Sequence, residues 1–432
     1  MKILWVCNIM PPMVAQALGL EYSVKEGWIT GILEEMIERE EELELGIAYP
    51  VAQIEKNGSF VLSLTSSKGK KSKKITCFEF IENTSRPEIY QGPELENRMK
   101  EIIRQFQPQL LHLFGTEYGH SLAAATVFAE KNKILVGLQG IVTECAKNYM
   151  ADLPEKIQKK KTFRDILKQD SIKQQQEKFY IRGERENKIL EMVGCVTGRT
   201  DFDLKAAKKV NPSLTYYSMN ETMRKEFYQG EWKAEECKPY QIFFSQADYP
   251  LKGFHHMLQA AVILNNKFPN LTIRVAGNSI TGYKTIKEKI KISAYGNYLR
   301  KMIQQGKMED KIIFLGKLSA EEMKREYLSS HCYVCASSIE NSPNSVAEAM
   351  LLGTPVIAAN TGGIPSMIEE GKEGLLFEPG NPKALAEAIE KIWSDKTLAE
   401  ELSKEGKKRA YKVHHPEENY KKLIKIYQEM LS

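Results

Sequence analysis

Short runs of apolar residues alternate with amphipathic segments along the whole chain. Six runs in the first half have the length of buried strands: Ile3–Cys7, Leu43–Ala48, Ile75–Phe80, Leu110–Phe114, Ile134–Leu138 and Val193–Thr197. Between them, Glu94–Phe106 repeats its apolar residues every three or four positions, which predicts a helix with one buried face. Buried strands that alternate with amphipathic helices are typical of parallel sheets covered by helices.

The second half of the chain starts the same alternation again. Its predicted strands are Gln241–Ser245, Leu271–Ala276, Ile312–Leu315, Cys332–Ala336, Val356–Ala359 and Leu375–Phe377. The final helix, Pro416–Leu431, carries an apolar stripe and is therefore expected to pack against another part of the protein. The pattern predicts an α/β protein with two doubly wound, Rossmann-like domains that face a cleft.

The chain of 432 residues is longer than one hydrophobic core usually supports, which also favours two domains. A polar segment without periodicity separates the two halves. We expect a first domain at 1–225, a linker at 226–239, a second domain at 240–412 and a final helix at 413–432.

Composition excludes several classes of protein. Hydrophobic residues make up 42% and charged residues 27% of the chain, but no apolar run reaches the roughly 20 residues that span a bilayer. The opening Lys2–Cys7 is too short for a signal-peptide core and is predicted to be a strand. Seven scattered cysteines fit a reducing compartment better than a disulfide framework. These features predict a cytoplasmic protein.

Positive charge is concentrated in two stretches, Lys68–Lys74 and Lys156–Lys168, although the net charge is only +5. The second stretch interleaves lysines with Phe163, Ile166 and Leu167. Such a pattern suits either peripheral contact with an anionic membrane surface or a solvated helix face, and the sequence leaves both open. No nucleic-acid motif accompanies the lysines, so a nucleic-acid partner is not expected.

Candidate chemistry is densest between residues 340 and 363. Glu340 lies in a loop after a predicted strand, and Glu348 lies inside the first turn of a helix for which Ser345 is the expected N-cap. Helix N-terminal amides at the carboxyl end of a parallel strand suit a diphosphate, and carboxylates can accept hydrogen bonds from sugar hydroxyls. The segment therefore predicts a nucleotide-sugar site. The alternative is a capping box in which Glu348 only satisfies a helix-end amide.

Further candidates follow other strands of the second half. Lys252 lies at the N-terminus of the helix Phe254–Asn265, where the helix dipole disfavours a cation unless an anion also binds. The same predicted edge also carries Gln246, Gly277, Leu315, Lys317, Leu318, Asn344 and Gly363. Each residue alone could be a solvated side chain or a tight turn, but together they favour one binding edge.

The first half offers fewer candidates. Trp28 heads a predicted helix, Glu117 and His120 follow one buried strand, and Gln139 follows the next. His112 lies within a predicted strand and is expected to be structural. No cluster of His, Cys, Asp and Glu has metal-ligand spacing, so neither a metal nor another cofactor is expected.

The residues from Glu340 to Glu348, and the Ala349–Pro365 segment that follows them, resemble the Glu-x7-Glu region of retaining GT-B glycosyltransferases of family four. The resemblance is specific across residues 240–380. In the first half, the segments around Trp28 and Gly115–His120 resemble bacterial polysaccharide-assembly members. The resemblance to this family implies two Rossmann-like domains and a final helix that crosses back to the first domain. It also implies sugar transfer with retention of configuration and without a metal.

The resemblance also implies roles for the motif residues. Glu348 would hold the nucleotide ribose, Glu340 would contact the donor sugar, and Lys252 would bind the diphosphate. Amides around Asn344 and Ser345 would help to hold the phosphates. Two positions depart from the family pattern: Ser245-Gln246 stands where Gly-Arg is usual, and Gln139 stands where many members have a histidine.

The expected function is transfer of a sugar from a nucleotide sugar, UDP-linked rather than GDP-linked, to a lipid-linked or growing glycan in cell-surface polysaccharide synthesis. The two departures motivate an alternative, a nucleotide-sugar-binding partner subunit without transferase activity. A GT-B epimerase is disfavoured by the Glu-x7-Glu spacing.

Overall fold

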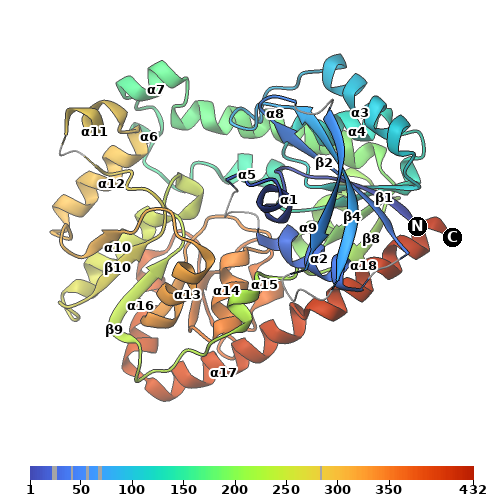
Figure 1. Ribbon diagram of the computed structural model, residues 1–432. Coiled ribbons are helices and arrows are strands. Elements are labelled where there is room, and N and C mark those ends of the chain that lie inside the picture. Colours follow the sequence, from blue (N-terminus) through green and yellow to red (C-terminus); the bar gives the residue numbers. More distant parts are fainter. Residues whose placement is uncertain (22–26, 40–41, 55–57, 67–70, 283–284) are drawn as a thin grey trace. The chain divides into compact units, whose positions relative to one another are not determined.

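The computed structural model describes residues 1–21, 27–39, 42–54, 58–66, 71–282 and 285–432 (Figure 1). Its internal contacts divide the chain into two compact units. Unit 1 consists of Met1–Thr143, Phe179–Arg224 and His414–Ser432, and unit 2 consists of Glu144–Lys178 and Lys225–Val413. Each unit is an α/β structure built on its own sheet, as the alternating pattern predicted.

The sheet of unit 1 has, within the described ranges, eight strands in the order β3-β4-β2-β1-β5-β6-β7-β8. Only β3 runs antiparallel to its neighbour. The strands are β1 (Lys2–Val6), β2 (Glu44–Val51), β3 (Ser59–Thr65), β4 (Ser72–Ile81), β5 (Leu110–Phe114), β6 (Ile134–Gly137), β7 (Cys195–Gly198) and β8 (Thr215–Ser218). All six strands predicted above for this half are present, and β3 and β8 are not among those six.

Helices cover both faces of this sheet. Ile3 and Trp5 of β1 belong to one core cluster, whereas Leu4 and Val6 belong to a second cluster, because successive side chains of a strand point to opposite faces. The helices with residues in unit 1 are α1 (Pro12–Ala17), α2 (Gly27–Arg39), α3 (Pro93–Phe106), α4 (Gly119–Val127), α5 (Val142–Asn148), α8 (Ile172–Met192), α9 (Asp201–Val210) and α18 (Pro416–Leu431). Burial on both faces explains the continuous apolar runs in the sequence.

The C-terminal helix α18 packs on unit 1, as the resemblance implied. The indole Nε1 of Trp5 donates to the Tyr427 hydroxyl over 2.9 Å, and this hydroxyl lies 2.7 Å from Nδ1 of His112. Because an indole N–H can only donate, the Tyr427 hydroxyl accepts from Trp5, whereas the direction of its bond with His112 depends on the tautomer of the neutral ring. Burial lowers the pKa of His112 to about 3, which agrees with the neutral ring and with its predicted structural role.

The sheet of unit 2 has, in the part that the structure describes, six parallel strands in the order β11-β10-β9-β12-β13-β14. They are β9 (Lys238–Phe244), β10 (Thr272–Val275), β11 (Ile312–Phe314), β12 (Ser330–Cys335), β13 (Val356–Ala359) and β14 (Leu375–Phe377). All six were predicted from their apolar runs.

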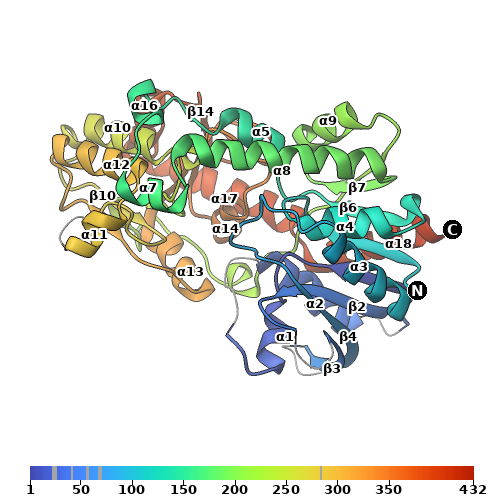
Figure 2. The same cartoon turned by 90° about the horizontal axis from the view of Figure 1, so that it is seen from above.

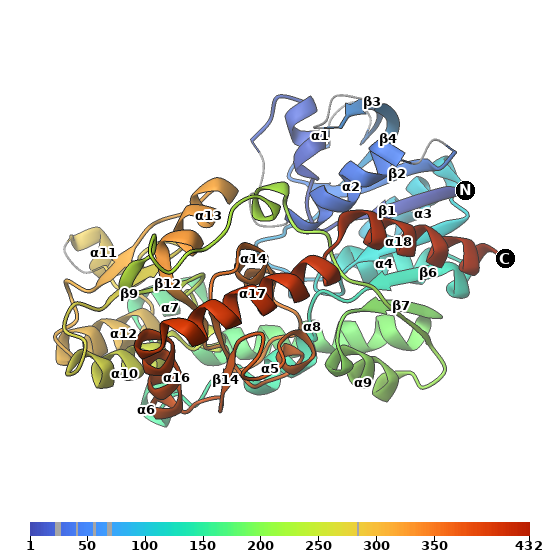
Figure 3. The ribbon, with the colours of Figure 1, turned by 90° about the horizontal axis from the view of Figure 1, so that it is seen from below.

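The helices of unit 2 surround this sheet, and α17 packs against both α14 and α16 (Figure 3). The helices are α6 (Glu155–Gln158), α7 (Phe163–Lys168), α10 (Phe254–Asn265), α11 (Ile286–Lys291), α12 (Ala294–Gln305), α13 (Ala320–Ser329), α14 (Asn344–Leu352), α15 (Ile364–Met367), α16 (Pro382–Ser394) and α17 (Lys396–Val413). None of the helices described is both long and apolar enough to cross a membrane.

The division into units differs from the expected domain boundaries at residues 144–178, which group with unit 2 (Figure 2). Polar contacts hold this segment there. The Asp165 carboxylate accepts a hydrogen bond from the Ala294 amide at the start of α12 over 2.9 Å, and Nε2 of His255 donates to the Ala151 carbonyl over 2.7 Å. Helical periodicity cannot reveal such contacts between distant residues.

The expected linker, residues 226–239, also packs on unit 2. Trp232 is buried, its indole donates to the Ser330 carbonyl over 2.8 Å, and its amide donates to the Leu352 carbonyl over 2.8 Å. The segment is therefore anchored to the sheet edge despite its polar composition.

Candidate functional site

The carboxyl ends of the strands of unit 2 bring together residues from distant parts of the sequence. Strand β10 is the neighbour of β9 on one side within the sheet, and β12 is its neighbour on the other side. The strand order therefore reverses its direction at β9. Open α/β sheets bind their ligands at such a switch point. Lys252 follows β9 and Glu340 follows β12, so the switch point carries both predicted residues.

Lys252 and Glu340 form an ion pair, with 2.6 Å between Nζ and Oε1. The Ser337 hydroxyl donates to the same carboxylate oxygen over 2.8 Å. The side chains of Lys252 and Glu340 remain 21% and 16% exposed, so a ligand from solvent can reach both. The Lys252 ammonium also lies 5.7 Å from the centre of the Tyr249 ring.

Electrostatics keep Lys252 charged. Burial alone would lower the pKa of Lys252, but the adjacent Glu340 carboxylate and its hydrogen bond outweigh burial and hold that pKa well above its ordinary value. The edge of the sheet therefore presents one fixed cation next to one carboxylate.

Two glycines fix the backbone around this pair. Gly253 has φ +68°, and a Cβ there would lie 1.8 Å from the Ala336 carbonyl oxygen. Gly362 has φ +53°, and a Cβ there would lie 2.0 Å from the Glu340 carbonyl oxygen. The Gly363 amide donates to that same oxygen over 2.9 Å. Only glycine fits these two contacts, which hold the Glu340 loop against both neighbouring loops.

The helix α14 starts earlier than the sequence predicted. Pro343 is the N-cap, no side chain caps the helix, and the Val346 amide donates to the Pro343 carbonyl over 3.0 Å. The prediction of Ser345 as N-cap was wrong, because the first helical hydrogen bond closes on Pro343 and Ser345 is already helical. The capping-box alternative for Glu348 is wrong for the same reason.

Glu348 instead lies in the second turn of α14, only 7% exposed, with its Oε2 3.4 Å from the Tyr327 hydroxyl. The same hydroxyl donates to the Ser345 carbonyl over 3.0 Å. Asn344 and Ser345 occupy the first two positions of α14, where amides have no partner inside the helix.

The remaining candidates of unit 2 lie at the ends of β9, β10 and β11. Gly277 and Gly316 exchange two backbone hydrogen bonds of 2.8 and 3.2 Å, and the Leu315 amide donates to the Val275 carbonyl over 2.9 Å. Lys317 is exposed and Leu318 is half-buried just beyond this bridge. The Gln246 amide donates to the Asp248 carboxylate over 3.3 Å.

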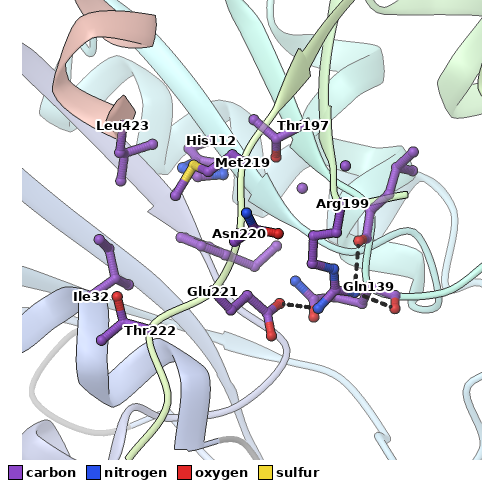
Figure 4. Close-up of a pocket in the computed structure, with 14 residues that line it drawn as sticks. Ile32, His112, Gln139, Thr197, Arg199, Met219, Asn220, Glu221, Thr222 and Leu423 are labelled. Atoms are coloured by element: carbon purple, nitrogen blue, oxygen red, sulfur yellow. Dashed lines mark hydrogen bonds and ion pairs between the residues drawn. The ribbon is translucent and has the colours of Figure 1, made fainter. Parts of the chain in front are cut away.

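Unit 1 has its own small cavity, of about 40 Å³, at the carboxyl ends of β5 to β8 (Figure 4). Gln139 lines it, as do residues that the sequence did not single out. The lining residues are Ile32, His112, Phe114, Gly137, Leu138, Gln139, Thr197, Gly198, Arg199, Met219, Asn220, Glu221, Thr222 and Leu423.

Arg199 is the central polar residue of this cavity. Its Nη1 lies 2.8 Å from Oε1 of Glu221, and its Nη2 donates to the carbonyls of Gln139 and Leu138 over 2.8 and 3.2 Å (Figure 4). The sequence analysis missed Arg199 and Glu221. Arg199 directly follows a predicted strand and could have been noticed, whereas Glu221 follows β8, which was not predicted.

A second polar cluster of unit 1 contains Glu117 and His120. His120 is fully buried, with Nδ1 2.5 Å from Oε2 of Glu82 and Nε2 3.0 Å from Oδ1 of Asn8. Oε1 of Glu82 accepts from the Gly119 and His120 amides at the start of α4. Burial would raise the pKa of Glu82, but His120 and these amides outweigh burial and lower it.

Glu117 is the more accessible member of this cluster, since it lies half-buried and accepts from the Asn8 amide over 3.5 Å. No sequence pattern pointed to Glu82, which follows β4 and comes from a different part of the chain than Asn8, Glu117 and His120. Trp28 lies in the first turn of α2, and its side chain is outside the described part of the structure. Across the described ranges, no three His, Cys, Asp or Glu side chains are grouped to hold a metal ion.

Comparisons with known sequences match the second half of the chain to one family. Residues 227–409 match the family model described as glycosyl transferases group 1. The chain is 28% identical over 182 residues to spore coat protein SA of Bacillus subtilis, a match that covers 41% of this chain and 46% of that protein. It is 28% identical over 183 residues to a D-inositol 3-phosphate glycosyltransferase of Corynebacterium urealyticum, with shares of 42% and 41%. The match thus spans less than half the length of these two relatives.

Comparisons with solved structures cover both units. A sucrose-phosphate synthase from Thermosynechococcus elongatus aligns with a TM-score of 0.68 and 15% identity, over 99% of this chain and 98% of that one. Anabaena HepE in complex with UDP-glucose aligns with a TM-score of 0.64 and 13% identity, over 99% of each chain. At these identities the likeness establishes the fold. Residues 227–409 therefore resemble the group 1 glycosyl transferases, and the fold of the two units matches that of GT-B structures.

Proposed function

We propose that this protein is a retaining glycosyltransferase that moves a sugar from a nucleotide sugar to a lipid-linked or growing glycan in cell-surface polysaccharide synthesis. The observation that carries the proposal is the Lys252–Glu340 pair at the switch point of unit 2. Glu340 lies four residues before Asn344, the first residue of α14. A cation, an accessible carboxylate and helix N-terminal amides are the groups that a sugar diphosphate requires.

The pair suggests how the donor would be held. The diphosphate would draw the Lys252 ammonium away from Glu340, and the freed carboxylate would accept hydrogen bonds from hydroxyls of the donor sugar. Amides of Asn344 and Ser345 would add dipoles aimed at the phosphates. Glu348, in the second turn of the same helix, would accept hydrogen bonds from the ribose. Gln246, Gly277, Leu315, Lys317, Leu318 and Gly363 would complete the donor-binding edge.

Catalysis would then be mainly electrostatic. As the bond between the sugar and the diphosphate breaks, negative charge grows on the leaving phosphate, and Lys252 and the α14 amides would stabilise it. The acceptor hydroxyl would attack from the face that the diphosphate leaves, which retains the anomeric configuration. Because these groups supply the positive charge, no metal or other cofactor is invoked.

Unit 1 would bind the acceptor. Trp28, Glu117 and His120 would line the acceptor side, with His120 acting through Asn8 because the imidazole itself is buried. Gln139 stands at the end of β6 and would donate a hydrogen bond to the leaving phosphate or to a sugar hydroxyl.

The donor would be a UDP-sugar rather than a GDP-sugar. This preference is supported by the fold shared with HepE, which was solved with UDP-glucose. The protein would work in the cytoplasm at the inner face of the membrane, where lipid-linked acceptors are presented, and nucleic acid is not a proposed partner.

One alternative has a specific observation in its favour. Gln246 replaces the usual arginine of the phosphate site and Gln139 replaces the usual histidine, which would suit a nucleotide-sugar-binding subunit without transferase activity. The presence of Lys252, Glu340 and Glu348 together favours the enzyme.

The test is turnover of a panel of UDP- and GDP-sugars by the purified chain, followed as release of nucleoside diphosphate with and without glycan acceptors. Glu340→Gln should remove most turnover but leave affinity for UDP nearly unchanged, since its partner is the sugar. Glu348→Ala should weaken UDP binding. Binding of a nucleotide sugar without turnover under any condition would support the non-catalytic subunit, and equal losses of UDP affinity in both variants would overturn the division of roles.

A further inference from the structure

Two short helices of unit 2, α7 (Phe163–Lys168) and α11 (Ile286–Lys291), lie side by side although the sequence separates them widely (Figures 1 and 2). Both carry apolar residues between lysines. Because the two helices are in contact, their apolar residues and lysines form one continuous surface of unit 2.

This surface exposes apolar side chains to an unusual degree. Phe163, Ile166 and Leu167 are 67%, 64% and 73% exposed, and Ile286 and Ile290 are 78% and 50% exposed. Among the described residues, the four most exposed large hydrophobic side chains all lie on α7 and α11. Concentration of exposed apolar residues in one place marks an interaction surface, whereas single exposed residues are common.

The outward orientation follows from how α7 is attached. Asp165 is 1% exposed, and its carboxylate accepts hydrogen bonds from the Thr162 amide at the start of its own helix and from the Ala294 amide of α12. The polar side of α7 thus faces unit 2, and its apolar side faces solvent, which is the reverse of an ordinary surface helix. Thr285 and Glu288 form a capping box at the start of α11.

Lysines surround the apolar residues. Lys156, Lys159, Lys160, Lys161 and Lys168 come from the α6–α7 segment, and Lys287, Lys289 and Lys291 come from α11. The nearby acids are already engaged, since Glu155 pairs with Lys159, Asp165 is buried, and Glu288 accepts from the Thr285 amide. The surface therefore has an apolar centre and a strongly positive margin.

We propose that this face, which consists of the five apolar residues and the eight lysines of the α6–α7 segment and α11, binds an anionic lipid membrane. Apolar side chains would enter the boundary between headgroups and acyl chains while lysines contact lipid phosphates. Charge complementarity selects this occupant over a second copy of the chain, because a symmetric dimer through this face would place lysines against lysines. Binding through this face would bring the active site to a lipid-linked acceptor. This consequence rests on the proposed function, whereas membrane binding itself does not.

The location differs from what the sequence indicated. The Lys156–Lys168 stretch was expected in the first domain, but it belongs to unit 2, together with the candidate donor site. The other basic stretch, Lys68–Lys74, falls in part outside the described residues.

The experiment is co-sedimentation of the full chain with vesicles of phosphatidylcholine alone or mixed with phosphatidylserine, at low and high salt. The intact protein should prefer the anionic vesicles and lose binding as salt rises. Replacing Lys159, Lys160 and Lys161 by Ser should lower partitioning on the order of a hundredfold. Ile166→Ser with Leu167→Ser should lower it at least about tenfold and should act even at low salt.

Matched controls come from the same unit. Lys383, Lys396 and Lys408 are exposed lysines of α16 and α17, and their replacement by Ser should leave partitioning nearly unchanged; Ile263→Ser is the apolar control. Equal binding to both vesicle types, or equal loss in test and control variants, would overturn the proposal. So would a dimer in sedimentation velocity that Leu167→Ser dissociates.

Failure of this proposal is distinguishable from failure of the proposed function. Hydrolysis of UDP-sugars without vesicles should be the same in the intact protein and the surface variants, because none of the substituted residues lies in the candidate donor site. Loss of membrane binding with intact hydrolysis is the expected result.

Discussion

Each sheet of this protein ends in an ion pair at its carboxyl edge, and the two pairs differ in their surroundings. In unit 2, Lys252 and Glu340 lie 2.6 Å apart with about one-fifth of each side chain exposed, and a serine hydroxyl is the third partner. In unit 1, Arg199 and Glu221 lie 2.8 Å apart with 4% and 11% of their side chains exposed, and Arg199 also binds two backbone carbonyls.

The difference indicates different roles for similar chemistry. The Lys252–Glu340 pair has solvent access and flexible side-chain partners, so a ligand can exchange with either member. The Arg199–Glu221 pair is largely shielded from solvent, and Arg199, at the end of β7, also donates to backbone carbonyls at the end of β6. The pair therefore has a structural role. Exposure and the type of partner, rather than the charges themselves, distinguish the proposed donor-binding pair Lys252–Glu340 from the structural pair Arg199–Glu221.

The largest expected effect concerns the structural role of the Arg199–Glu221 pair in unit 1. Arg199→Met should lower the free energy of unfolding of unit 1 by about 3–5 kcal/mol, because it leaves the Glu221 carboxylate buried without its cation. Urea denaturation measures this. Arg199→Met combined with Glu221→Leu should recover most of the loss, since no unpaired charge remains. A loss below about 1 kcal/mol in the single variant would mean that water already reaches the pair.

The second effect concerns the binding pair. Lys252→Ala should lower kcat/KM at least about a hundredfold, or about 2.7 kcal/mol of transition-state stabilisation, because Lys252 is the main side-chain cation expected on the diphosphate where Gln246 replaces arginine. Steady-state kinetics with the best UDP-sugar provide the measurement, and Lys383→Ala on exposed α16 is the control. A change smaller than about tenfold would remove Lys252 from this role.

A third, smaller effect tests the attachment of α18 to unit 1. Tyr427→Phe should cost about 1–3 kcal/mol of stability, because it leaves the buried Trp5 indole and the His112 ring nitrogen without their shared partner. Thermal and urea unfolding would measure it. Tyr411→Phe, at a half-exposed tyrosine of α17, should have an effect within about 0.5 kcal/mol.

The smallest effect is a pH dependence that both units should share. Burial lowers the pKa of His112 in unit 1 and, with help from His256, the pKa of His255 in unit 2, each to about 3. Since the unfolded rings bind protons near pH 6.5, stability should be constant above that pH and fall as the pH drops from 6.5 towards 3. At pH 5.5 the loss should be about 1 kcal/mol per histidine. Urea midpoints at pH 7.5 and 5.5 check it; a higher midpoint at pH 5.5 would contradict buried neutral rings.

The strands and the candidate donor edge were predictable because their signals are local. Buried parallel strands appear as unbroken apolar runs, and Glu340, Asn344, Ser345 and Glu348 occupy one stretch of sequence. Lys252 was found because its position before a helix is electrostatically unfavourable without an anion. The start of α14 was misplaced, since a serine two positions after a proline suggested a cap that Pro343 provides through its backbone.

Other features required the tertiary structure. Arg199, Glu221 and Glu82 follow three different strands, β7, β8 and β4. Their partners are backbone groups or side chains far away in sequence, so no sequence spacing could reveal them. The same holds for residues 144–178, which join unit 2 through an Asp165 carboxylate on an α12 amide.

The sequence by itself determined two α/β sheets and indicated the residues of one proposed donor-binding edge, because hydrophobic periodicity and helix-end chemistry act between near neighbours along the chain. Only the tertiary structure decided which ion pair is open and which is closed, and which helices share an apolar, basic face. Burial and contact between distant segments set those properties, and both arise only when the chain is folded.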